Sequence, residues 1–551
     1  MSAIANRLHH ARRDFGGVLR NADLRRLELA WAFSIVSTWA YSIAVVVFAF
    51  TEGGATAVGV VGLLRWVAAG VISPFAALLA DRYDRRAVMI ASDLLRAVLI
   101  AAAAASVLAD ASAAIVYVLA TLVSVAGTPF RPAEAAFTPQ LVRTPEELGA
   151  ANVVASAIES TGIFVGPALG GLLLSGTSVA TTFFVTAAGV ALSAVFLLRI
   201  GDRASPVDHD EEETAGGIGA ELLGGMRAIF GDRSVALLVG LFAAQTFVDG
   251  LLGVLIAVVA LDYLGGGAAT VGWLNAASGV GGIVGAGIAG VLVGRGRLAA
   301  DFGVGVLLFG LPLALLAAWK SEGLALLLLA VIGIGNTVAD VSGMTLLQRV
   351  TPASVVGRVF GVLESILLLT VALGAAVAPV LVWALGTRGA LVAAGVLLPA
   401  LVIPSFAVLR RIDDRTGVPT RELELLRRVP FFASLPELAI ERLARSAERE
   451  TARPGETVVA QGDPGERFFV VVDGELQVAV DGADVATLEE GDYFGEIALL
   501  RDIPRTATVR ARRESALLAL DRDDFLNAVT GYAPSLSSAE AVVGLRLGAH
   551  A

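Results

Sequence analysis

Long apolar stretches separated by short charged breaks fill the chain between about residue 28 and residue 409. A helix needs about 20 apolar residues to cross the roughly 30 Å hydrocarbon core of a bilayer, and twelve stretches have about that length or more. They cover residues 28–50, 56–80, 87–109, 113–131, 150–174, 179–199, 235–261, 269–293, 301–319, 323–347, 354–385 and 389–409. The pattern predicts an all-α polytopic membrane domain with twelve transmembrane helices, within residues 1–411.

The breaks between these helices alternate in charge. The arginine-rich set contains Arg82, Arg85, Arg86, Arg143, Arg203, Arg227, Arg233, Arg295, Arg297, Arg349 and Arg358, whereas the opposite set contains Glu52, Asp110, Asp262, Lys320, Glu322 and Arg388. An arginine-rich arm also precedes the first helix. Because loops rich in Lys and Arg stay on the cytoplasmic side, we expect a multi-pass protein of the cytoplasmic (inner) membrane with both termini inside.

The helices fall into two halves of six, at about 20–200 and 230–411, separated by an acidic loop at 200–234 that we expect to be cytoplasmic. The halves echo each other: Gln-Leu-Val-Arg-Thr-Pro at 140–145 precedes the fifth helix, as Gln-Arg-Val-Thr-Pro at 348–352 precedes the eleventh. Two similar halves are typical of transporters built from repeats, with the substrate path between them.

The composition changes at about residue 412, where a polar linker (412–425) leads to a soluble segment, 426–551. Residues 421–448 contain charged amphipathic helices, and short alternating apolar runs such as 467–472 follow, with glycines in the turns between them. This pattern predicts a C-terminal α+β domain, a β-jelly roll with flanking helices, on the cytoplasmic side.

Composition excludes several classes of protein. Apolar residues make up 56% of the 551 residues and charged residues only 17%, so the chain is not a single soluble enzyme. There is no cysteine and there are four histidines, which leaves almost no material for a metal site or for histidine-based catalysis. The net charge of -10 argues against nucleic acid as a partner. We therefore expect no enzyme, no metal and no nucleic-acid ligand.

Two motifs in the apolar region resemble the major facilitator superfamily, in particular its drug- and siderophore-exporter branch. Leu-Ala-Asp-Arg-Tyr-Asp-Arg-Arg at 79–86 is similar to the loop motif between helices two and three, although Ala77 and Asp84 replace two of its glycines. Gly-Ile-Phe-Val-Gly-Pro-Ala-Leu-Gly-Gly at 162–171 is similar to the antiporter motif of helix five. The transport-motif residues are Asp81, Arg82, Arg85, Arg86, Gly162, Gly166, Pro167, Gly170 and Gly171.

The resemblance, which covers about residues 20–410, implies roles for these residues. Asp81 would pair with arginines and with the N-terminus of helix eleven as a latch, while the arginines alone would also hold the loop inside. Glycines at spacing four let another helix backbone approach, and Pro167 favours a bend. Helix eight carries a matching run, Gly281, Gly285 and Ala289, and in the family helices five and eight face each other.

Ionisable residues inside the predicted spans are costly and are functional candidates by default. Asp93 and Arg96 are three residues apart, so we expect them to pair with each other. The proton-coupling candidates are Asp249, Asp340 and Glu159. Glu159 also suits a structural role, since Glu364 occupies a similar place in the second half. Arg65, Arg131 and Glu134 remain without an assigned partner or role.

The C-terminal segment contains the run Phe-Gly-Glu-Ile-Ala-Leu-Leu-Arg-Asp-Ile-Pro-Arg-Thr-Ala-Thr-Val at 494–509. It resembles the phosphate-binding cassette of cyclic nucleotide-binding domains, and the resemblance extends over about 423–535. It implies that Glu496 accepts the ribose 2′-hydroxyl, that Arg505 pairs with the cyclic phosphate, and that amides around Gly495, Ile497 and Ala498 complete the cradle. A helix start and a guanidinium fork both suit a phosphate.

The other residues of the predicted nucleotide site are Phe494, Thr506 and Thr508, with the terminal helix (about 535–547) as a lid and Arg546 as a candidate cap over the base. Thr506 does not separate cyclic GMP from cyclic AMP, so both nucleotides remain candidates. The alternative is a structural ion pair between Arg505 and Glu496 in a domain that has lost its ligand.

Together these features predict a secondary active exporter, a proton-coupled antiporter of a small molecule that works by alternating access. Cyclic AMP or cyclic GMP would regulate it through the C-terminal domain. The expected partners are the lipid bilayer, the small-molecule substrate and the cyclic nucleotide. The alternatives are a non-transporting membrane receptor, an exporter of the nucleotide itself, and a domain that serves only in assembly. The sequence does not identify the substrate or the oligomeric state.

Overall fold

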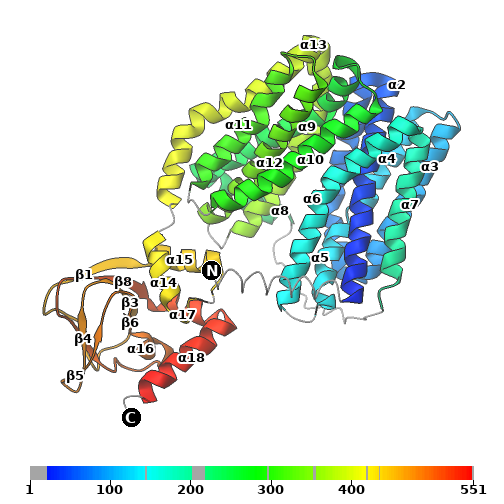
Figure 1. The fold of residues 1–551 in the computed structure, drawn as a ribbon. Helices are drawn as coiled ribbons and strands as arrows, with labels where there is room; N and C mark the ends of the chain where they lie inside the picture. Colours follow the sequence, from blue (N-terminus) through cyan, green and yellow to red (C-terminus); the bar gives the residue numbers. More distant parts are fainter. Residues whose placement is uncertain are drawn as a thin grey trace. The chain divides into compact units, whose positions relative to one another are not determined.

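The computed structural model describes residues 21–142, 145–201, 218–293, 297–351, 355–416, 420–433 and 435–548. The chain forms two compact units, Met1–Thr416 and Gly417–Ala551 (Figure 1). Their boundary falls inside the predicted linker 412–425. Most of the predicted acidic loop (202–217) and the N-terminal arm lie outside the described residues.

The first unit is a bundle of long helices. They are α2 (Ala22–Arg82), α3 (Arg85–Leu108), α4 (Ala113–Gly127), α5 (Phe130–Leu141), α6 (Pro145–Gly176), α7 (Val179–Leu198), α8 (Ile218–Gly231), α9 (Arg233–Val258) with the π-helix η1 (Val259–Tyr263), α10 (Ala268–Val293), α11 (Leu298–Leu316), α12 (Glu322–Val350) and α13 (Val356–Thr416). Ten helical segments of the described residues are long and apolar enough to cross a membrane.

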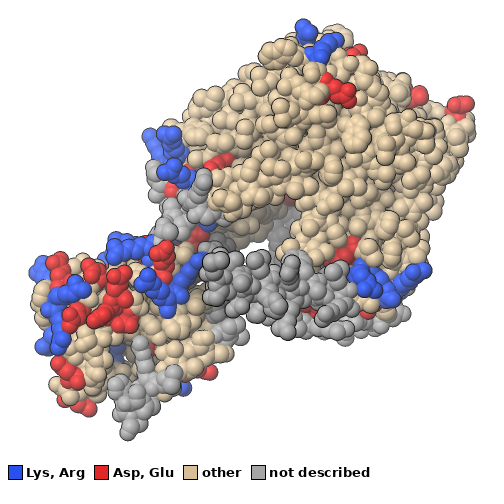
Figure 2. Space-filling model, viewed as in Figure 1, with Lys and Arg blue, Asp and Glu red and all other residues tan. Residues whose placement is uncertain are grey.

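Two of these ten segments contain a break. The 61-residue helices α2 and α13 are interrupted at Gly54 (φ +58°) and Gly386 (φ +69°), where the left-handed backbone favours glycine. Each therefore supplies two spans, and the prediction of twelve is confirmed. On the face drawn in Figure 2, the sides of this unit carry almost no charged residues, which gather at its two ends. That distribution suits a multi-pass membrane protein.

Carboxylates cap several helices of the bundle. Asp84, where the loop motif of the family has a glycine, accepts a hydrogen bond of 2.7 Å from the amide of Ala87 and begins α3. Asp413, near the end of α13, accepts from the amides of Ala299 (2.8 Å) and Ala300 (2.9 Å) at the start of α11. The last span is thereby tied to another helix of the second half.

Glycines set the closest helix contacts in the first half. A Cβ atom added at Gly170 of α6 would lie 2.8 Å from the carbonyl oxygen of Ala40, and one at Gly162 would lie 2.7 Å from the Ile35 side chain. The predicted glycine face of α6 therefore packs on the first segment of α2. Small residues at such an interface let two backbones approach where hydrocarbon supplies no hydrophobic drive.

A second glycine contact joins the two halves. A Cβ at Gly171 of α6 would lie 2.8 Å from the Cα of Gly272 in α10, so helices five and eight do face each other, as the resemblance implies. The matching run in α10 is used differently: Gly281 and Gly285 pack on Ala330 and Ile334 of α12, within the second half. The two runs therefore do not face each other, because each is occupied by a helix of its own half.

The second unit contains α14 (Thr420–Arg428), α15 (Glu437–Ser446), α16 (Glu496–Arg501), α17 (Arg522–Thr530) and α18 (Ala533–Gly548). Its strands are β1 (Glu448–Ala452), β2 (Thr457–Val459), β3 (Arg467–Asp473), β4 (Leu476–Val480), β5 (Ala483–Leu488), β6 (Tyr493–Phe494), β7 (Thr508–Ala511) and β8 (Ser515–Asp521). They form two antiparallel sheets of four strands, β1-β8-β3-β6 and β2-β7-β4-β5, which confirms the predicted β-jelly roll with flanking helices.

An aromatic cluster attaches the helices of this unit to one sheet. Phe431 and Phe432 follow α14, Phe468 lies on β3 and Phe525 on α17, and all four side chains are fully buried. The rings of Phe468 and Phe525 stack with centroids 4.8 Å apart, and Phe431 meets both edge-on at 5.8 Å. The amphipathic helices predicted over 421–448 thus belong to the core of the domain.

We predict that Gly170→Ala lowers the melting temperature of the purified full-length protein, because the new methyl group would meet the backbone of Ala40. Gly149→Ala in the same helix is the matched control, since a Cβ there meets no atom within 4 Å and alanine favours a helix by up to about 1 kcal/mol. Size-exclusion chromatography after heating measures both. Equal melting temperatures for the two variants would contradict the packing role of Gly170.

Candidate functional site

A central cavity of about 730 Å³ lies between the two halves of the first unit. Its walls come from α2, α3, α4, α5 and α6 on one side and from α9, α10, α12 and α13 on the other. One end is closed by glycine contacts, at Gly171 with Gly272 and at Gly59, whose added Cβ would lie 2.5 Å from the Pro379 side chain. Both contacts lie at the end of the bundle that carries the breaks at Gly54 and Gly386, and there they join the two halves.

Two of the predicted coupling carboxylates lie in the second half. Asp249 of α9 is exposed on the cavity wall. Asp340 of α12 accepts hydrogen bonds from the Asn336 amide (3.1 Å) and the Gln245 amide (3.4 Å). Gln245 also donates to Asn336 (3.0 Å), and Asn336 itself lines the cavity. The structure thus connects Asp340 to the cavity through two amide side chains that the sequence did not single out.

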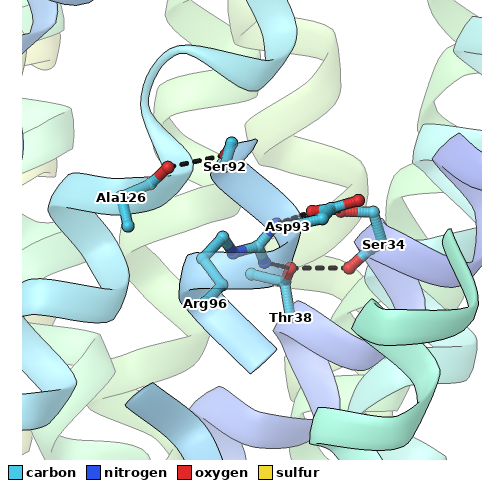
Figure 3. A network of polar contacts seen from close by, with 6 residues as sticks. All are labelled: Ser34, Thr38, Ser92, Asp93, Arg96 and Ala126. Atoms are coloured by element: carbon cyan, nitrogen blue, oxygen red, sulfur yellow. Dashed lines mark hydrogen bonds and ion pairs between the residues drawn. The ribbon is translucent and has the colours of Figure 1, made fainter. Parts of the chain in front are cut away.

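The predicted Asp93–Arg96 pair is confirmed, with Nη1 of Arg96 2.9 Å from Oδ1 of Asp93 (Figure 3). Both side chains are buried, at 0% and 4% exposed. Ser34 of α2 donates to Asp93 (3.2 Å) and accepts from Arg96 (2.9 Å), while Thr38 accepts a second bond from Arg96. The network joins α3 to the first segment of α2, so the pair has a structural role.

The third candidate, Glu159, lies in a different cluster. Arg131 of α5 contacts the carboxylates of Glu134 (2.5 Å) and Glu159 (3.1 Å) and lies over the ring of Trp31. Sequence reasoning missed Glu28 of α2, which is 5% exposed and interacts electrostatically with Arg131 and Glu134. Neither of its carboxylate oxygens has a hydrogen-bond partner among the described residues. Its place at the edge of the first apolar stretch made it look like a boundary residue.

The loop motif between α2 and α3 makes contacts inside the first half. Arg85 donates to the carbonyl of Ala136 in α5 (3.3 Å), and Arg86 donates to the carbonyls of Leu197 (3.0 Å) and Leu198 (2.9 Å) at the end of α7. Cations at helix C-termini are stabilising. Arg82 is exposed, and the side chain of Asp81 lies outside the described residues, so the latch stays a prediction.

In the second unit, the cassette residues gather around a buried guanidinium. Arg505 is 6% exposed and donates to the carbonyl oxygens of Gly495 (3.2 Å) and Arg467 (2.7 Å). Glu496, 1% exposed, begins α16 beside it, and the first-turn amides of a helix have no acceptor within the helix. In these hydrogen bonds the guanidinium is held by neutral carbonyls, and the carboxylate of Glu496 acts on it electrostatically.

Burial lowers the pKa of the Arg505 guanidinium, and the nearby carboxylates of Glu496, Asp463 and Glu466 oppose that effect. A bound anion would favour the charged form further. Gly495 has φ +95°, and a Cβ there would lie 2.5 Å from Nη1 of Arg505, so glycine is what leaves room for the guanidinium. The Arg505 guanidinium is thus held in a fixed position that suits an anionic ligand.

The remaining cassette residues divide between core and rim. Phe494 is buried and stacks on Phe469 with centroids 5.0 Å apart, and Ala498 is buried against Gly465. The hydroxyl of Thr508 accepts from the amide of Gln461 (3.0 Å). Ile497 and Thr506 are half-buried. The predicted lid is helix α18, which buries Ala539 and Val543; the side chain of Arg546 lies outside the described residues.

Comparison with protein families decides what the first unit is. A family model described as Major Facilitator Superfamily matches residues 29–258 and 241–446. The chain belongs to the major facilitator superfamily. A second model, described as Cyclic nucleotide-binding domain, matches residues 449–532 of this major facilitator. Both predicted resemblances are confirmed at this level, and membership of the superfamily makes the membrane unit a transporter rather than an enzyme.

Two relatives of this major facilitator each match less than a quarter of its length. A cAMP-dependent protein kinase regulatory subunit of Yarrowia lipolytica is 39% identical over 102 residues, 18% of this chain and 27% of the relative. The cGMP-dependent protein kinase egl-4 of Caenorhabditis elegans is 34% identical over 119 residues, 22% of this chain and 15% of the relative. The chain thus spans less than a third of these relatives.

Among solved structures, PKAR CBD2 with bound Sp-2Cl-cAMPS is 27% identical with a TM-score of 0.21. The match covers 23% of this chain and 91% of that one.

We predict that Asp93→Asn destabilises the major facilitator unit by roughly 3–5 kcal/mol, because Arg96 would stay buried without its carboxylate. The double variant Asp93→Leu/Arg96→Met removes both charges at similar volume and should regain most of that loss. Thermal unfolding of the full-length protein, followed by retention on size exclusion, measures both. A double variant as unstable as the single one would contradict the pairing argument.

Proposed function

We propose that this major facilitator is a secondary active exporter, a proton-coupled antiporter of a small molecule, regulated by a cyclic nucleotide bound to its C-terminal domain. The observation that carries the regulatory part is the buried Arg505 guanidinium, held by two main-chain carbonyls at the cassette. A planar fork of N–H donors beside helix-start amides suits a cyclic phosphate. Glu496 next to it is the acceptor for the ribose 2′-hydroxyl.

Cyclic AMP is the first nucleotide to test, because the Yarrowia relative is named as a cAMP-dependent regulatory subunit. Cyclic GMP is the rival, since the Caenorhabditis relative is named as cGMP-dependent. The full site comprises Phe494, Gly495, Glu496, Ile497, Ala498, Arg505, Thr506 and Thr508, with Arg546 on the lid. Nucleotide binding would change how α18 rests on the domain and thereby shift the populations of the transport states.

Asp249 supports the proposal of proton coupling, since it exposes a carboxylate on the wall of the cavity between the halves. Asp340 adds a second carboxylate that reaches the same wall through Asn336. Glu159 is the weakest of the three candidates because it already pairs with Arg131 at 3.1 Å. We place the arginine-rich ends and both termini on the cytoplasmic side of the inner membrane. The glycine contacts that close the cavity lie at the opposite end, near Gly54 and Gly386, so the cavity would be closed to the outside.

We predict that cyclic AMP or cyclic GMP at 100 times its dissociation constant stabilises the full-length protein by about 2.7 kcal/mol. Arg505→Ala should abolish this stabilisation, measured by thermal unfolding across a nucleotide titration. Gly495→Ala should abolish it too, because the new methyl group displaces the guanidinium. Gly455→Ala, in the turn between β1 and β2, is the matched control: φ is +82° there and a Cβ meets no atom within 4 Å, so the response should persist. Stabilisation that survives in Arg505→Ala, or no stabilisation with either nucleotide, overturns the sensor.

We predict that everted membrane vesicles containing the protein accumulate one of two dyes, cationic ethidium or anionic carboxyfluorescein, when their lumen is acidified. Nigericin, which collapses the pH gradient, should abolish accumulation, and Asp249→Asn should reduce it to the nigericin level. Asp262→Asn, an exposed carboxylate of η1, is the control and should leave accumulation unchanged. Accumulation that ignores nigericin, or an Asp249→Asn variant as active as wild type, contradicts proton coupling through this residue.

In the same vesicles the cytoplasmic face points outward, so added nucleotide reaches the C-terminal domain. A typical allosteric coupling changes the initial rate of dye uptake at least about fivefold, and Arg505→Ala should remove this response. An unchanged rate at saturating nucleotide would leave a transporter with a nucleotide-binding domain that does not regulate it.

A further inference from the structure

The wall of the central cavity carries four charged side chains among the described residues: Arg65, Arg96, Arg131 and Asp249. Two of the three arginines are compensated. Arg96 pairs with Asp93 at 2.9 Å, and Arg131 lies between two carboxylates at 2.5 and 3.1 Å. The third arginine, Arg65, therefore needs a separate explanation.

Arg65 lies on the second segment of α2 and contacts only neutral groups in the hydrogen bonds that the structure gives it. Its Nε donates to the Ser124 hydroxyl at 2.9 Å, and its Nη1 donates to the Ser42 hydroxyl at 3.3 Å. None of the ion pairs among the described residues includes Arg65. A guanidinium inside a membrane domain costs several kcal/mol unless an anion faces it.

The surroundings of Arg65 contain a hydroxyl donor without an acceptor. Tyr41 lines the same cavity, is 1% exposed and interacts electrostatically with Arg65. Its hydroxyl has no hydrogen-bond partner among the described residues. A guanidinium without a counter-charge and an unpartnered hydroxyl, on a wall that also carries Trp39 and Trp66, form half of a binding site: N–H and O–H groups next to aromatic surface.

We propose that Arg65 binds the anionic group of the transported molecule, so that the substrate is an organic anion with an aromatic body. The guanidinium fork would accept a carboxylate, sulfonate or phosphate group, with the Tyr41 hydroxyl as a further donor. Ser42 and Ser124 hold the fork in place without neutralising it. This inference rests on the proposed function, since it names the substrate class of the same cavity.

The test uses a matched set of ligands that share one ring system: indole-3-acetate (anion), indole-3-acetamide (neutral) and tryptamine (cation). Binding to full-length protein in nanodiscs is measured by titration calorimetry, without a pH gradient and without nucleotide. Indole-3-acetate should bind at least about tenfold more tightly than the other two, because only it supplies the counter-charge. Equal binding of the amide or the amine, or no binding of the acetate at millimolar concentration, overturns the proposal.

Variants of Arg65 assign that preference to the residue. Arg65→Gln should lower acetate affinity to that of the acetamide, whereas Arg65→Lys, which keeps the charge but loses the fork, should retain part of the preference. Arg233→Gln, an exposed arginine at the start of α9, is the matched control and should bind like wild type. If Arg65→Gln fails to fold, the Arg65→Lys variant still decides. If Arg65→Lys binds indole-3-acetate with wild-type affinity and full preference, the guanidinium fork of Arg65 does not bind the anionic group.

This experiment is independent of the proposed transport and regulation. Acetate binding that depends on Arg65, in a protein with neither dye uptake nor nucleotide response, would refute the proposed function and keep the cavity as an anion site. Proton-coupled uptake of ethidium together with no acetate preference would support the proposed function and refute the anion site. Repeating the titration in Arg505→Ala keeps the C-terminal anion site out of the measurement.

Discussion

Backbone contact at glycine is the constraint on which the membrane unit depends. Lipid tails are as apolar as leucine side chains, so helices in a bilayer gain little from hiding apolar surface and depend on close packing instead. Helix α6 illustrates the consequence, since Gly170 meets α2 within its own half and Gly171, one residue on, meets α10 of the other half. A single helix therefore holds one half together and also sets where the two halves touch.

The cavity lies between the two halves, next to the end of the bundle at which such contacts join them. The joining contacts are Gly171 with Gly272 and Gly59 with Pro379, near the breaks at Gly54 and Gly386. Charges that would be prohibitive against lipid are tolerated on this wall, because some are paired and the rest face the hollow. The paired ones, such as Asp93 with Arg96, fix the helices, while Arg65 and Asp249 remain available to a solute.

The sequence predicted the fold well because its main determinants are local. Apolar length decides a span, and the gaps predicted between 50 and 56 and between 385 and 389 contain the breaks of α2 at Gly54 and of α13 at Gly386. The cassette could also be read, since Glu496, Arg505 and the turn at Gly495 lie within a dozen residues of one another.

What the sequence left out depends on contacts between distant segments. Gln245 is an ordinary amide until the fold brings it to Asp340, 95 residues further along the chain. Glu28 looked like a helix boundary because it is the first residue of the first predicted span. Its interaction with Arg131 is set by tertiary packing, which the order of residues does not reveal. The same is true of the glycine run at Gly281, whose partner turned out to be α12.

The capping carboxylate of Asp413 has a mechanical consequence. It lies three residues before Thr416, where the first unit ends, and it grips two amides at the start of α11. Any tension transmitted along the chain from the C-terminal unit must pass this clamp before it reaches the bilayer. The load would then fall on α11 and α13 together.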